Sequence, residues 1–598
     1  MRKFFWASIL AVMLTSQALG WQKQAVFPNW KGYIDDTLAM NSMMSFKFWH
    51  GQGQVHVKVS ERTRSFRMFV NGHELDTSGM TSGGSYDADI SAFTIDGMNT
   101  LQVSNIEPLG LKDAVTVSVP YPEILEGTPE DEGIHPEALA LISRIISSDV
   151  EHGFPSAQLA VIRNGRLVFS GAWGTTNTSK PDSPKVTTNT LYDLASVSKM
   201  LGLNFAVQKL VTDGLLDVDA RLGELLPGVG KDKAGITVKD LLCHRSGLSA
   251  EVHYHDRNYD LQAKRHNPKS TNPLYTGMDG SQETRAKTLN AILRTPLSCK
   301  PRTKTVYSDT GYMLLCFIVE KIAGKPLDEY LRENFWTPLG LTRIAYNPLE
   351  HGFTSDDCAA TELKGNTMTR GALVRYDGLR EYTVQGEVHD EKAYYSMAGV
   401  SGHAGLFANA ETAAKLASLM LTGGYGEHKL FSQNVIDMFT SPQDKDAGMW
   451  GIGWWREGTD KRPYYFGTEA SSWTVGHQGF TGTLVMIDPS RNLVIAYLTN
   501  KLNSPAVMPL KRKRTFAGSW YTASTLGFVA QILGVGMDAG GDVSEQLEAL
   551  IADMAYWSVR LIPSGAGRSH PAVRNAESKI DLLTDEETAR RLRLLLPK

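Results

Sequence analysis

The stretch that says most about this chain is LYDLASVSK, residues 191–199. It places a serine, Ser196, three residues before a lysine, Lys199. On a helix, positions i and i+3 share a face, so the Ser196 hydroxyl and the Lys199 amine can come within hydrogen-bonding distance. A nucleophile beside a base is what acyl transfer requires. By itself the spacing is weak evidence, because a chain of 598 residues can contain such a pair by chance.

Two further motifs follow in the chain. Tyr307-Ser308-Asp309 precedes an apolar run that predicts a helix over 309–323, and a loop that enters a helix can direct a phenol into a cleft. His477-Gln478-Gly479 precedes a pair of predicted strands, where a strand edge can hold a substrate by backbone hydrogen bonds. A serine–lysine motif followed by two such triplets is characteristic of the serine enzymes that react with penicillin. These companions make Ser196 a candidate nucleophile rather than a helix cap.

Other stretches make this resemblance more specific. From about residue 128 to about residue 537 the chain resembles the family of class C β-lactamases and DD-peptidases, which implies a β-lactamase/transpeptidase-like fold. The resemblance rests on LYDLAS at 191–196, DLL through SGL at 240–248, and PLGL at 338–341. Within that family, VHDEKA at 388–393 and GVSGHAGLF at 399–407 resemble the penicillin-binding protein 4B group, whose members are named as D-alanyl-D-alanine carboxypeptidases.

The resemblance implies a role for each motif residue. Ser196 becomes acylated, and Lys199 and Tyr307 share the transfer of its proton to the leaving group. The backbone N–H groups of Ser196 and Phe480 form the oxyanion hole. The implied substrate-binding residues are Asp309, His477, Gly479 and Phe480. The resemblance implies no metal ion and no organic cofactor.

Two motif residues depart from the family pattern. His477 stands where the family usually has lysine, and a neutral histidine supplies only part of the charge that would hold a β-lactam carboxylate. Efficient β-lactamase activity is therefore not expected. Asp309 stands where asparagine is common, and a carboxylate near Lys199 favours its ammonium form. We therefore expect Lys199 to be a weaker base and Tyr307 to take more of that role.

The expected fold class is α/β (α+β), with an antiparallel sheet closed by both ends of the catalytic region and a helical subdomain. We expect four parts: a signal peptide at 1–20, a β-rich accessory domain at 21–125, a serine hydrolase domain at 126–537 and a helical extension at 538–598. Alternating valines at 55–59 and the turn signal Asn71-Gly72 predict a β-sandwich in the accessory domain. Apolar runs predict long helices over 191–215 and 519–533.

Composition and the N-terminal residues indicate which kinds of partner and which cell compartment to expect. The formal net charge is −3, so no strong basic field favours nucleic acid, and the run at 511–514 is interpreted as a solvated loop. Arg2 and Lys3 precede an apolar run that ends in Ala18-Leu19-Gly20, the order of a secretory signal. We expect a periplasmic or secreted protein, or one anchored in the inner membrane if the signal is uncleaved. Of the four cysteines, Cys243 and Cys316 are expected to be buried thiols.

The leading functional prediction is an exported D-alanyl-D-alanine carboxypeptidase that acts on peptidoglycan stem peptides and is covalently inhibited by β-lactams. An esterase, an amidase or a weak β-lactamase would use the same chemistry on another substrate. A non-catalytic cell-wall protein is the alternative of another class, and residues 21–125 would then contact glycan. His389 and His403 could shape the cleft, but bracing of loops by hydrogen bonds is the favoured interpretation.

Overall fold

The computed structural model describes residues 20–29, 43–108, 110–371, 374–443, 450–457, 463–507, 515–539 and 542–597. The predicted signal sequence, apart from Gly20, and the basic run at 511–514 lie outside the described residues. The chain forms two compact units: residues up to Glu123 with Thr422–Ser432, and Ile124–Leu421 with the residues from Gln433 onward.

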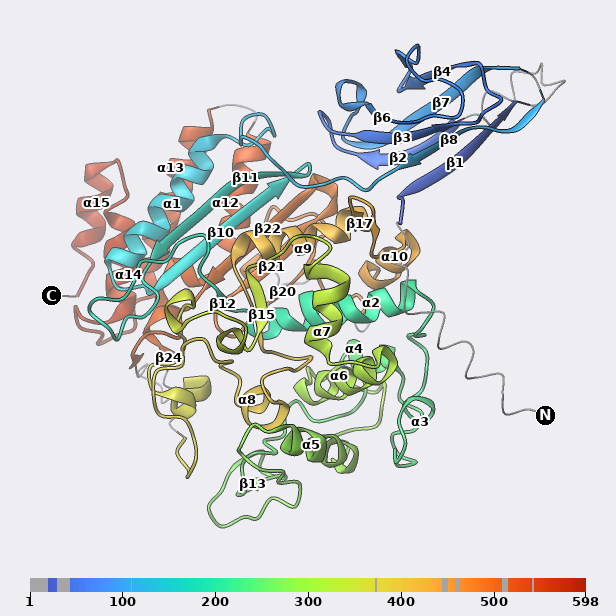
Figure 1. The fold of residues 1–598 in the computed structure, drawn as a ribbon. Coiled ribbons are helices and arrows are strands. Elements are labelled where there is room, and N and C mark those ends of the chain that lie inside the picture. The colour runs from blue at the N-terminus through green and yellow to red at the C-terminus, as the bar shows by residue number, and fades with distance from the viewer. Residues whose placement is uncertain are drawn as a thin grey trace, which may run out of the picture. The chain divides into compact units, whose positions relative to one another are not determined.

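The first unit contains two four-stranded antiparallel sheets (Figure 1). Side chains alternate along the strands, so Val55, Val57 and Val59 are buried while their neighbours point outward. One core takes side chains from both sheets, which confirms the predicted β-sandwich. One sheet has the order β1 (Lys23–Asn29), β8 (Leu111–Val119), β3 (Gln54–Val59) and β6 (Ser85–Asp89); the other has β2 (Met43–Phe48), β7 (Gly97–Glu107), β4 (Ser65–Val70) and β5 (His73–Leu75).

The second unit is built on a seven-stranded sheet. Strand β10 pairs with β11 on one side and with β22, more than 300 residues later, on the other, so the sheet is closed by both ends of the catalytic region as predicted. Only the short β9–β11 pair is parallel among the described ladders of this sheet. The order is β19 (Trp455–Arg456), β20 (Val475–Gln478), β21 (Leu484–Asp488), β22 (Leu493–Thr499), β10 (Ser156–Arg163), β11 (Arg166–Gly174) and β9 (Leu125–Glu126).

Helices cover this sheet on both faces, and β21 and β22 are therefore buried along their whole length. On one face α1 (Pro136–Glu151) packs with α12 (Gly527–Asp538) over the strands in one apolar core. The C-terminal helices adjoin this layer and are α13 (Val543–Arg560), α14 (Pro571–Ile580) and α15 (Glu586–Arg593). A buried ion pair between Lys579 of α14 and Asp149 of α1 joins the two sets of helices.

The helical subdomain supplies the rest of the unit. Its central helix is α6 (Asp309–Ala323), which is buried over most of its length and begins where the sequence predicts. The other helices are α2 (Phe205–Thr212), α3 (Leu222–Leu225), α4 (Val238–Leu242), α5 (Gln282–Arg294), α7 (Leu327–Leu331), α8 (Glu391–Met397), α9 (Ala410–Thr422), α10 (Gln433–Thr440) and α11 (Pro463–Phe466). A small sheet has the order β12 (Tyr192–Asp193), β16 (Leu406–Ala408) and β15 (Ile344–Tyr346); two-stranded pairs are β13 (Tyr259–Asp260) with β14 (Arg265–His266), and β23 (Ala506–Val507) with β24 (Thr515–Phe516). A further pair, β17 (Gly424–Tyr425) with β18 (His428–Lys429), belongs to the first unit.

Two sequence predictions about helices were wrong. The continuous helix predicted over 191–215 is divided into strand β12, a 3₁₀ turn at Ala195–Val197, a π-helix at Lys199–Asn204 and α2. The helix predicted from 519 begins only at Gly527, after two 3₁₀ turns. An apolar run cannot distinguish a buried strand or turn from a buried helix, because all three exclude polar side chains.

Two further observations concern thiols and membranes. All four cysteines are free, and Cys243, Cys316 and Cys358 are buried, so the two thiols predicted to be buried are confirmed. Among the described residues, the structure has no helix that combines the length and the apolar character needed to cross a membrane.

Candidate active site

The candidate nucleophile lies on a constrained turn between β12 and the π-helix. Ala195, directly before Ser196, has a φ of 46°, a left-handed conformation that costs free energy in a residue with a Cβ atom. The Asp193 carboxylate holds this turn, because it accepts hydrogen bonds from the backbone N–H groups of Ala195 (2.8 Å) and His389 (2.6 Å). The turn therefore presents the partly exposed Ser196 side chain from a rigid base.

Lys199 is fully buried, and its ammonium group donates three hydrogen bonds. Its Nζ donates to Ser196 Oγ at 3.1 Å, to Asp309 Oδ1 at 2.8 Å and to the backbone oxygen of His403 at 3.0 Å. The same Nζ lies 4.8 Å from the centre of the Tyr307 ring. The structure thus brings Ser196, Lys199, Tyr307 and Asp309 together, although Lys199 and Asp309 are 110 positions apart in sequence.

The charges around Lys199 determine its protonation state. Burial alone would lower the pKa of Lys199, but the charges of Asp309 and Tyr307 outweigh this effect and raise it. Burial raises the pKa of Tyr307, and the Lys199 ammonium partly offsets that rise. Lys199 is therefore an ammonium group in the resting site. The Ser196 proton can pass to Tyr307 only when Tyr307 is a phenolate, and the adjacent Lys199 ammonium is the group that stabilises this form.

The second motif is held in place by the start of α6. Ser308 caps the helix, because its Oγ accepts from the Gly311 N–H at 3.1 Å, and its own N–H donates to His244 Nδ1 at 2.9 Å. The His244 ring also packs against Tyr307, with 4.5 Å between ring centres. Burial and the charge of Lys199 lower the pKa of His244 to about 3, so this imidazole is a neutral acceptor. His244 thereby fixes the direction from which Tyr307 enters the site.

The third motif lies against the nucleophile turn at the end of β20. A Cβ atom on Gly479 would lie 2.4 Å from the Leu194 carbonyl oxygen and 2.1 Å from Thr483 Oγ1, so this close approach requires glycine. The Thr483 hydroxyl donates to the same Leu194 oxygen at 2.9 Å. The approach brings the loop that carries Phe480 to the turn that carries Ser196, as an oxyanion hole made from their two N–H groups requires.

His477 and Phe480 lie on either side of this glycine. The His477 ring is buried, with its centre 4.7 Å from that of Trp455 and 6.1 Å from that of Tyr307. Phe480 is 39% exposed, and its ring stacks on His389 at 5.8 Å. His389 is in turn bonded through Nε2 to Glu362 at 2.5 Å. His389 therefore braces the loop under Phe480, in line with the favoured interpretation of this residue.

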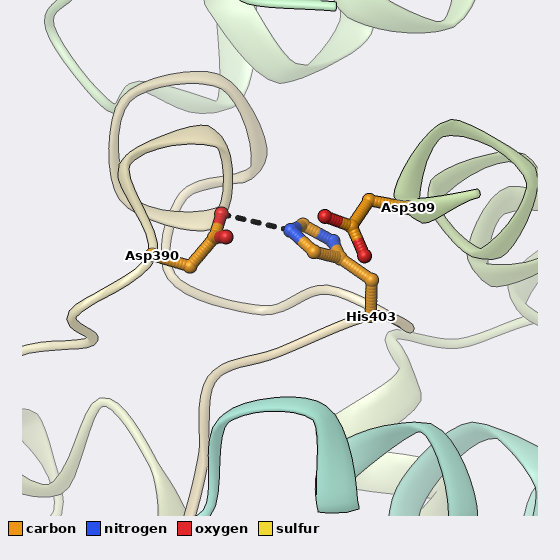
Figure 2. Close-up of side chains that lie close together, drawn as sticks. All are labelled: Asp309, Asp390 and His403. Carbon is orange, nitrogen blue, oxygen red and sulfur yellow. Dashed lines mark hydrogen bonds and ion pairs between the residues drawn. The ribbon is translucent and has the colours of Figure 1, made fainter. Parts of the chain in front are cut away.

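A second group of charged side chains adjoins Lys199. Lys392 Nζ lies 3.0 Å from Asp390, 3.4 Å from Glu251 and 3.5 Å from Asp309. His403 donates to or accepts from Asp390 through Nε2 at 2.8 Å and Ser401 through Nδ1 at 2.7 Å. Figure 2 shows the His403 ring between the carboxylates of Asp390 and Asp309. His403 is thus held by hydrogen bonds on both ring nitrogens, as the bracing interpretation requires.

The group in Figure 2 has the donor types of a cation site. Potential ligand atoms of Asp309, Asp390 and His403 lie within 4.8 Å of one another. The ammonium groups of Lys199 and Lys392 already lie against these carboxylates and compensate their charge. A divalent ion here would meet two like charges, so the residues fit an ion-pair network better than a metal centre.

Sequence reasoning missed several residues of this site. Asp193, His244, Glu362 and Lys392 were not assigned any role in the chemistry, although Asp193 and Lys392 lie within quoted family motifs. For Asp193 and His244 a signal is present, because each is an ionisable side chain within or beside an apolar run, where an unpaired charge is costly. Glu362 and Lys392 have no such local signal.

The comparisons with known proteins agree with this geometry. The family model described as Beta-lactamase matches residues 142–518, and the chain belongs to this family of β-lactamase/transpeptidase-type serine hydrolases. An Escherichia coli K12 protein named "Putative D-alanyl-D-alanine carboxypeptidase" is 40% identical over 422 residues, which cover 68% of this chain and 93% of that protein. The family resemblance identified in the sequence is confirmed.

Two other proteins are similar to this chain. A Bacillus subtilis 168 protein named N-acetylmuramyl-L-alanine amidase is 41% identical over 406 residues, 65% of this chain and 87% of that protein. The structure of an octameric penicillin-binding protein homologue from Pyrococcus abyssi has a TM-score of 0.48 at 18% identity, covering 71% of this chain and 82% of that one.

Proposed function

We propose that this protein is a serine D-alanyl-D-alanine carboxypeptidase that removes the terminal D-alanine from peptidoglycan stem peptides. The observation that carries the proposal is the contact of Lys199 Nζ with both Ser196 Oγ and Asp309. Tyr307 lies beside this contact, and Gly479 closely approaches the turn that carries Ser196. This arrangement provides a nucleophile, a proton acceptor with an adjacent cation, and backbone N–H groups for an oxyanion.

In the proposed reaction, Tyr307 acts as a phenolate that the Lys199 ammonium stabilises, and it accepts the Ser196 proton as Ser196 Oγ attacks the carbonyl carbon of the penultimate D-alanine. The N–H groups of Ser196 and Phe480 stabilise the tetrahedral oxyanion. The C–N bond then breaks, and the proton passes from Tyr307 to the departing amine of D-alanine. Water attacks the ester, gives its proton back through Tyr307 and Lys199, and releases the shortened peptide and free Ser196.

A second substrate bond is supported by the Bacillus subtilis relative, whose name specifies the N-acetylmuramyl–L-alanine amide. The same acyl-transfer residues could cleave that amide, because the chemistry differs only in which carbonyl enters the site. Mass analysis of digested muropeptides separates the two. Loss of one D-alanine supports the carboxypeptidase, whereas release of a free stem peptide and N-acetylmuramic acid supports the amidase. An esterase or weak β-lactamase would leave both bonds intact.

Covalent labelling tests the shared chemistry. The wild type is expected to gain the mass of a penicillin or fluorophosphonate adduct, and Ser196→Ala is expected to gain neither. The control is Ser198→Ala. Ser198 lies in the same motif, but its side chain is buried and its hydroxyl accepts a hydrogen bond from the Leu406 N–H. Absence of an adduct on wild-type Ser196 with both reagents and no cleavage of muropeptides would contradict the proposal.

Export is a separate proposal, supported by the order of charged, apolar and small residues at 1–20. The mature protein is then expected to begin at Trp21 and to accumulate outside the cytoplasm. N-terminal sequencing of protein from fractionated cells tests this, and an intact Met1 in a cytoplasmic fraction would contradict it.

A further inference from the structure

Asp309 is shared between two ammonium groups. Its Oδ1 accepts from Lys199 Nζ at 2.8 Å, and its Oδ2 lies 3.5 Å from Lys392 Nζ. Lys392 is on α8, its side chain is only 3% exposed, and none of the three catalytic motifs contains it. A single carboxylate therefore separates Lys392 from the lysine that contacts the nucleophile.

The charges that face Lys392 come from four parts of the fold. Asp309 is at the start of α6, Glu251 is in the loop between α4 and β13, Asp390 and Glu391 are at the start of α8, and His403 reaches Lys392 through Asp390. His255 and Tyr376 also interact with Lys392, and His253 lies 3.6 Å from Glu251 and 3.8 Å from Glu391. Lys199 lies beyond Asp309, so the two lysines face four carboxylates between them: Asp309, Glu251, Asp390 and Glu391.

The second ammonium group changes how Asp309 acts on the nucleophile. Burial alone would raise the pKa of Asp309, but Lys199 and Lys392 together lower it well below its usual range, so the carboxylate stays ionised. Without Lys392, the whole negative charge of Asp309 and its neighbours would act on Lys199 and Tyr307. That charge would raise the pKa values of both groups and make proton removal from Ser196 harder.

We propose that Lys392 is a positioning residue for acyl transfer: it binds the second oxygen of Asp309, fixes that carboxylate against Lys199 and limits its hold on the Lys199 proton. Asp390 orients Lys392 at 3.0 Å and is itself held by His403. The inference rests on the proposed function, because it assigns Lys392 to the acylation of Ser196. The proposal predicts that fast acylation of Ser196 needs Lys392 only when the Asp309 carboxylate is present.

A double-variant cycle tests this pairing. Lys392→Met should slow the acylation of Ser196 roughly 10²-fold and move the acid limb of its pH profile to higher pH, because the remaining negative charge raises the pKa of the base. Asp309→Asn alone should move that limb to lower pH. Asp309→Asn/Lys392→Met removes one charge of each sign and should recover to within about 10-fold of wild type.

The measurement is the second-order rate constant for modification of Ser196 by a fluorophosphonate, which phosphonylates the hydroxyl with loss of fluoride and stands in for acylation, followed by intact mass between pH 5 and 10. Lys579→Met is the matched control, because Lys579 is also buried and paired with an aspartate but lies on α14. It should lower the thermal midpoint without moving the pH profile. If Lys392→Met does not fold, two results still test the pairing. The acid limb of the pH profile should move to lower pH in Asp309→Asn, and folding should recover in the double variant.

The outcomes separate the two proposals. A double variant as slow as Lys392→Met, or a Lys392→Met protein with the wild-type rate and pH profile, overturns the positioning role and leaves the proposed function standing. If no reagent modifies Ser196 of the wild type and the protein cleaves no muropeptide, the proposed function is overturned, and the positioning role with it.

Discussion

The β-sandwich and the catalytic unit bury different kinds of polar side chain. In the described part of the sandwich the buried polar residues are all uncharged: Gln52, Thr63, Thr94, Asn99 and Ser118. Asn99, for example, bonds to the backbone of Ile95 and Gly97. The catalytic unit instead buries lysines, aspartates, glutamates and histidines beside Ser196. Because burying a charge costs far more than burying an amide, clustered buried charge indicates chemistry rather than folding.

One feature of the catalytic unit qualifies this comparison. Lys579 and Asp149 form an ion pair with both side chains fully buried. This pair joins α14 to α1, and neither residue belongs to a catalytic motif. Burial alone would lower the pKa of Lys579, and Asp149 only partly offsets this. In the site, by contrast, neighbouring charges outweigh burial and raise the pKa of Lys199. Buried charge near a nucleophile and buried charge elsewhere can therefore be separated by experiment.

The largest expected effect belongs to Lys199. Lys199→Met should reduce acylation of Ser196 by roughly 10³- to 10⁴-fold, because it removes the cation that assists Tyr307. Intact-mass kinetics with a fluorophosphonate measures the loss. Lys579→Met should lower thermal stability but keep the acylation rate within about twofold. Equal losses in the two variants would contradict the distinction between catalytic and structural buried charge.

Gly479→Ala should have the next largest effect. Thr483 can rotate away from a new Cβ atom, but the Leu194 carbonyl oxygen belongs to the nucleophile turn and must be displaced. We expect roughly a 10²-fold lower acylation rate, because a small displacement of an oxyanion donor is costly. Gly235→Ala is the control, since its Cβ would meet no atom within 4 Å. Normal acylation by Gly479→Ala would show that the close approach is not required.

The His389–Glu362 pair should produce a pH-dependent effect on stability. Burial alone would lower the pKa of His389, but the hydrogen bond and charge of Glu362 outweigh it and raise the pKa above 6.5. The stability contributed by the protonated pair is then fully present below pH 6.5 and is lost as the pH rises through the folded-state pKa of His389.

Thermal unfolding at pH 5 to 9 measures this contribution. The stability difference between the wild type and Glu362→Gln should be largest at low pH and should shrink as the pH rises. A difference that stays constant or grows with pH would show that His389 is neutral in the folded protein.

The smallest effect on activity is expected in the sandwich. Asn99→Ala removes a buried amide that bonds to the Ile95 N–H and to the Ile95 and Gly97 carbonyl oxygens, and it should destabilise this unit by about 2 kcal/mol. Acylation of Ser196 at a temperature where the protein stays folded should not change. Calorimetry and labelling of the same sample test both statements, and a parallel loss of activity would couple the sandwich to the reaction.

The sequence predicted the elements whose pattern is local. The Asn71-Gly72 turn, the strand pair β21–β22 and the helix after Ser308 all follow from periodicity and turn chemistry. The Ser196–Lys199 contact also follows from spacing, although the chain between them is not an α-helix. These features need only neighbours in sequence.

The remainder depends on contacts that no local pattern encodes. Asp193 acquires its role from His389, 196 positions away, and Lys392 acquires its role from Asp309. The break in the predicted 191–215 helix arises because β12 pairs with β16, more than 200 residues later. Such contacts depend on tertiary packing, which overrides local preference.

The π-helix at Lys199–Asn204 separates Lys199 from α2. A π-helical turn contains about one residue more than an α-helical turn, because its hydrogen bonds join residues i and i+5. One extra residue is therefore accommodated within this turn, and α2 keeps the face that it presents to the core. A comparison of relatives at this point should allow a one-residue gap, because a relative with an α-helical turn here would present the same face of α2 behind the same serine and lysine.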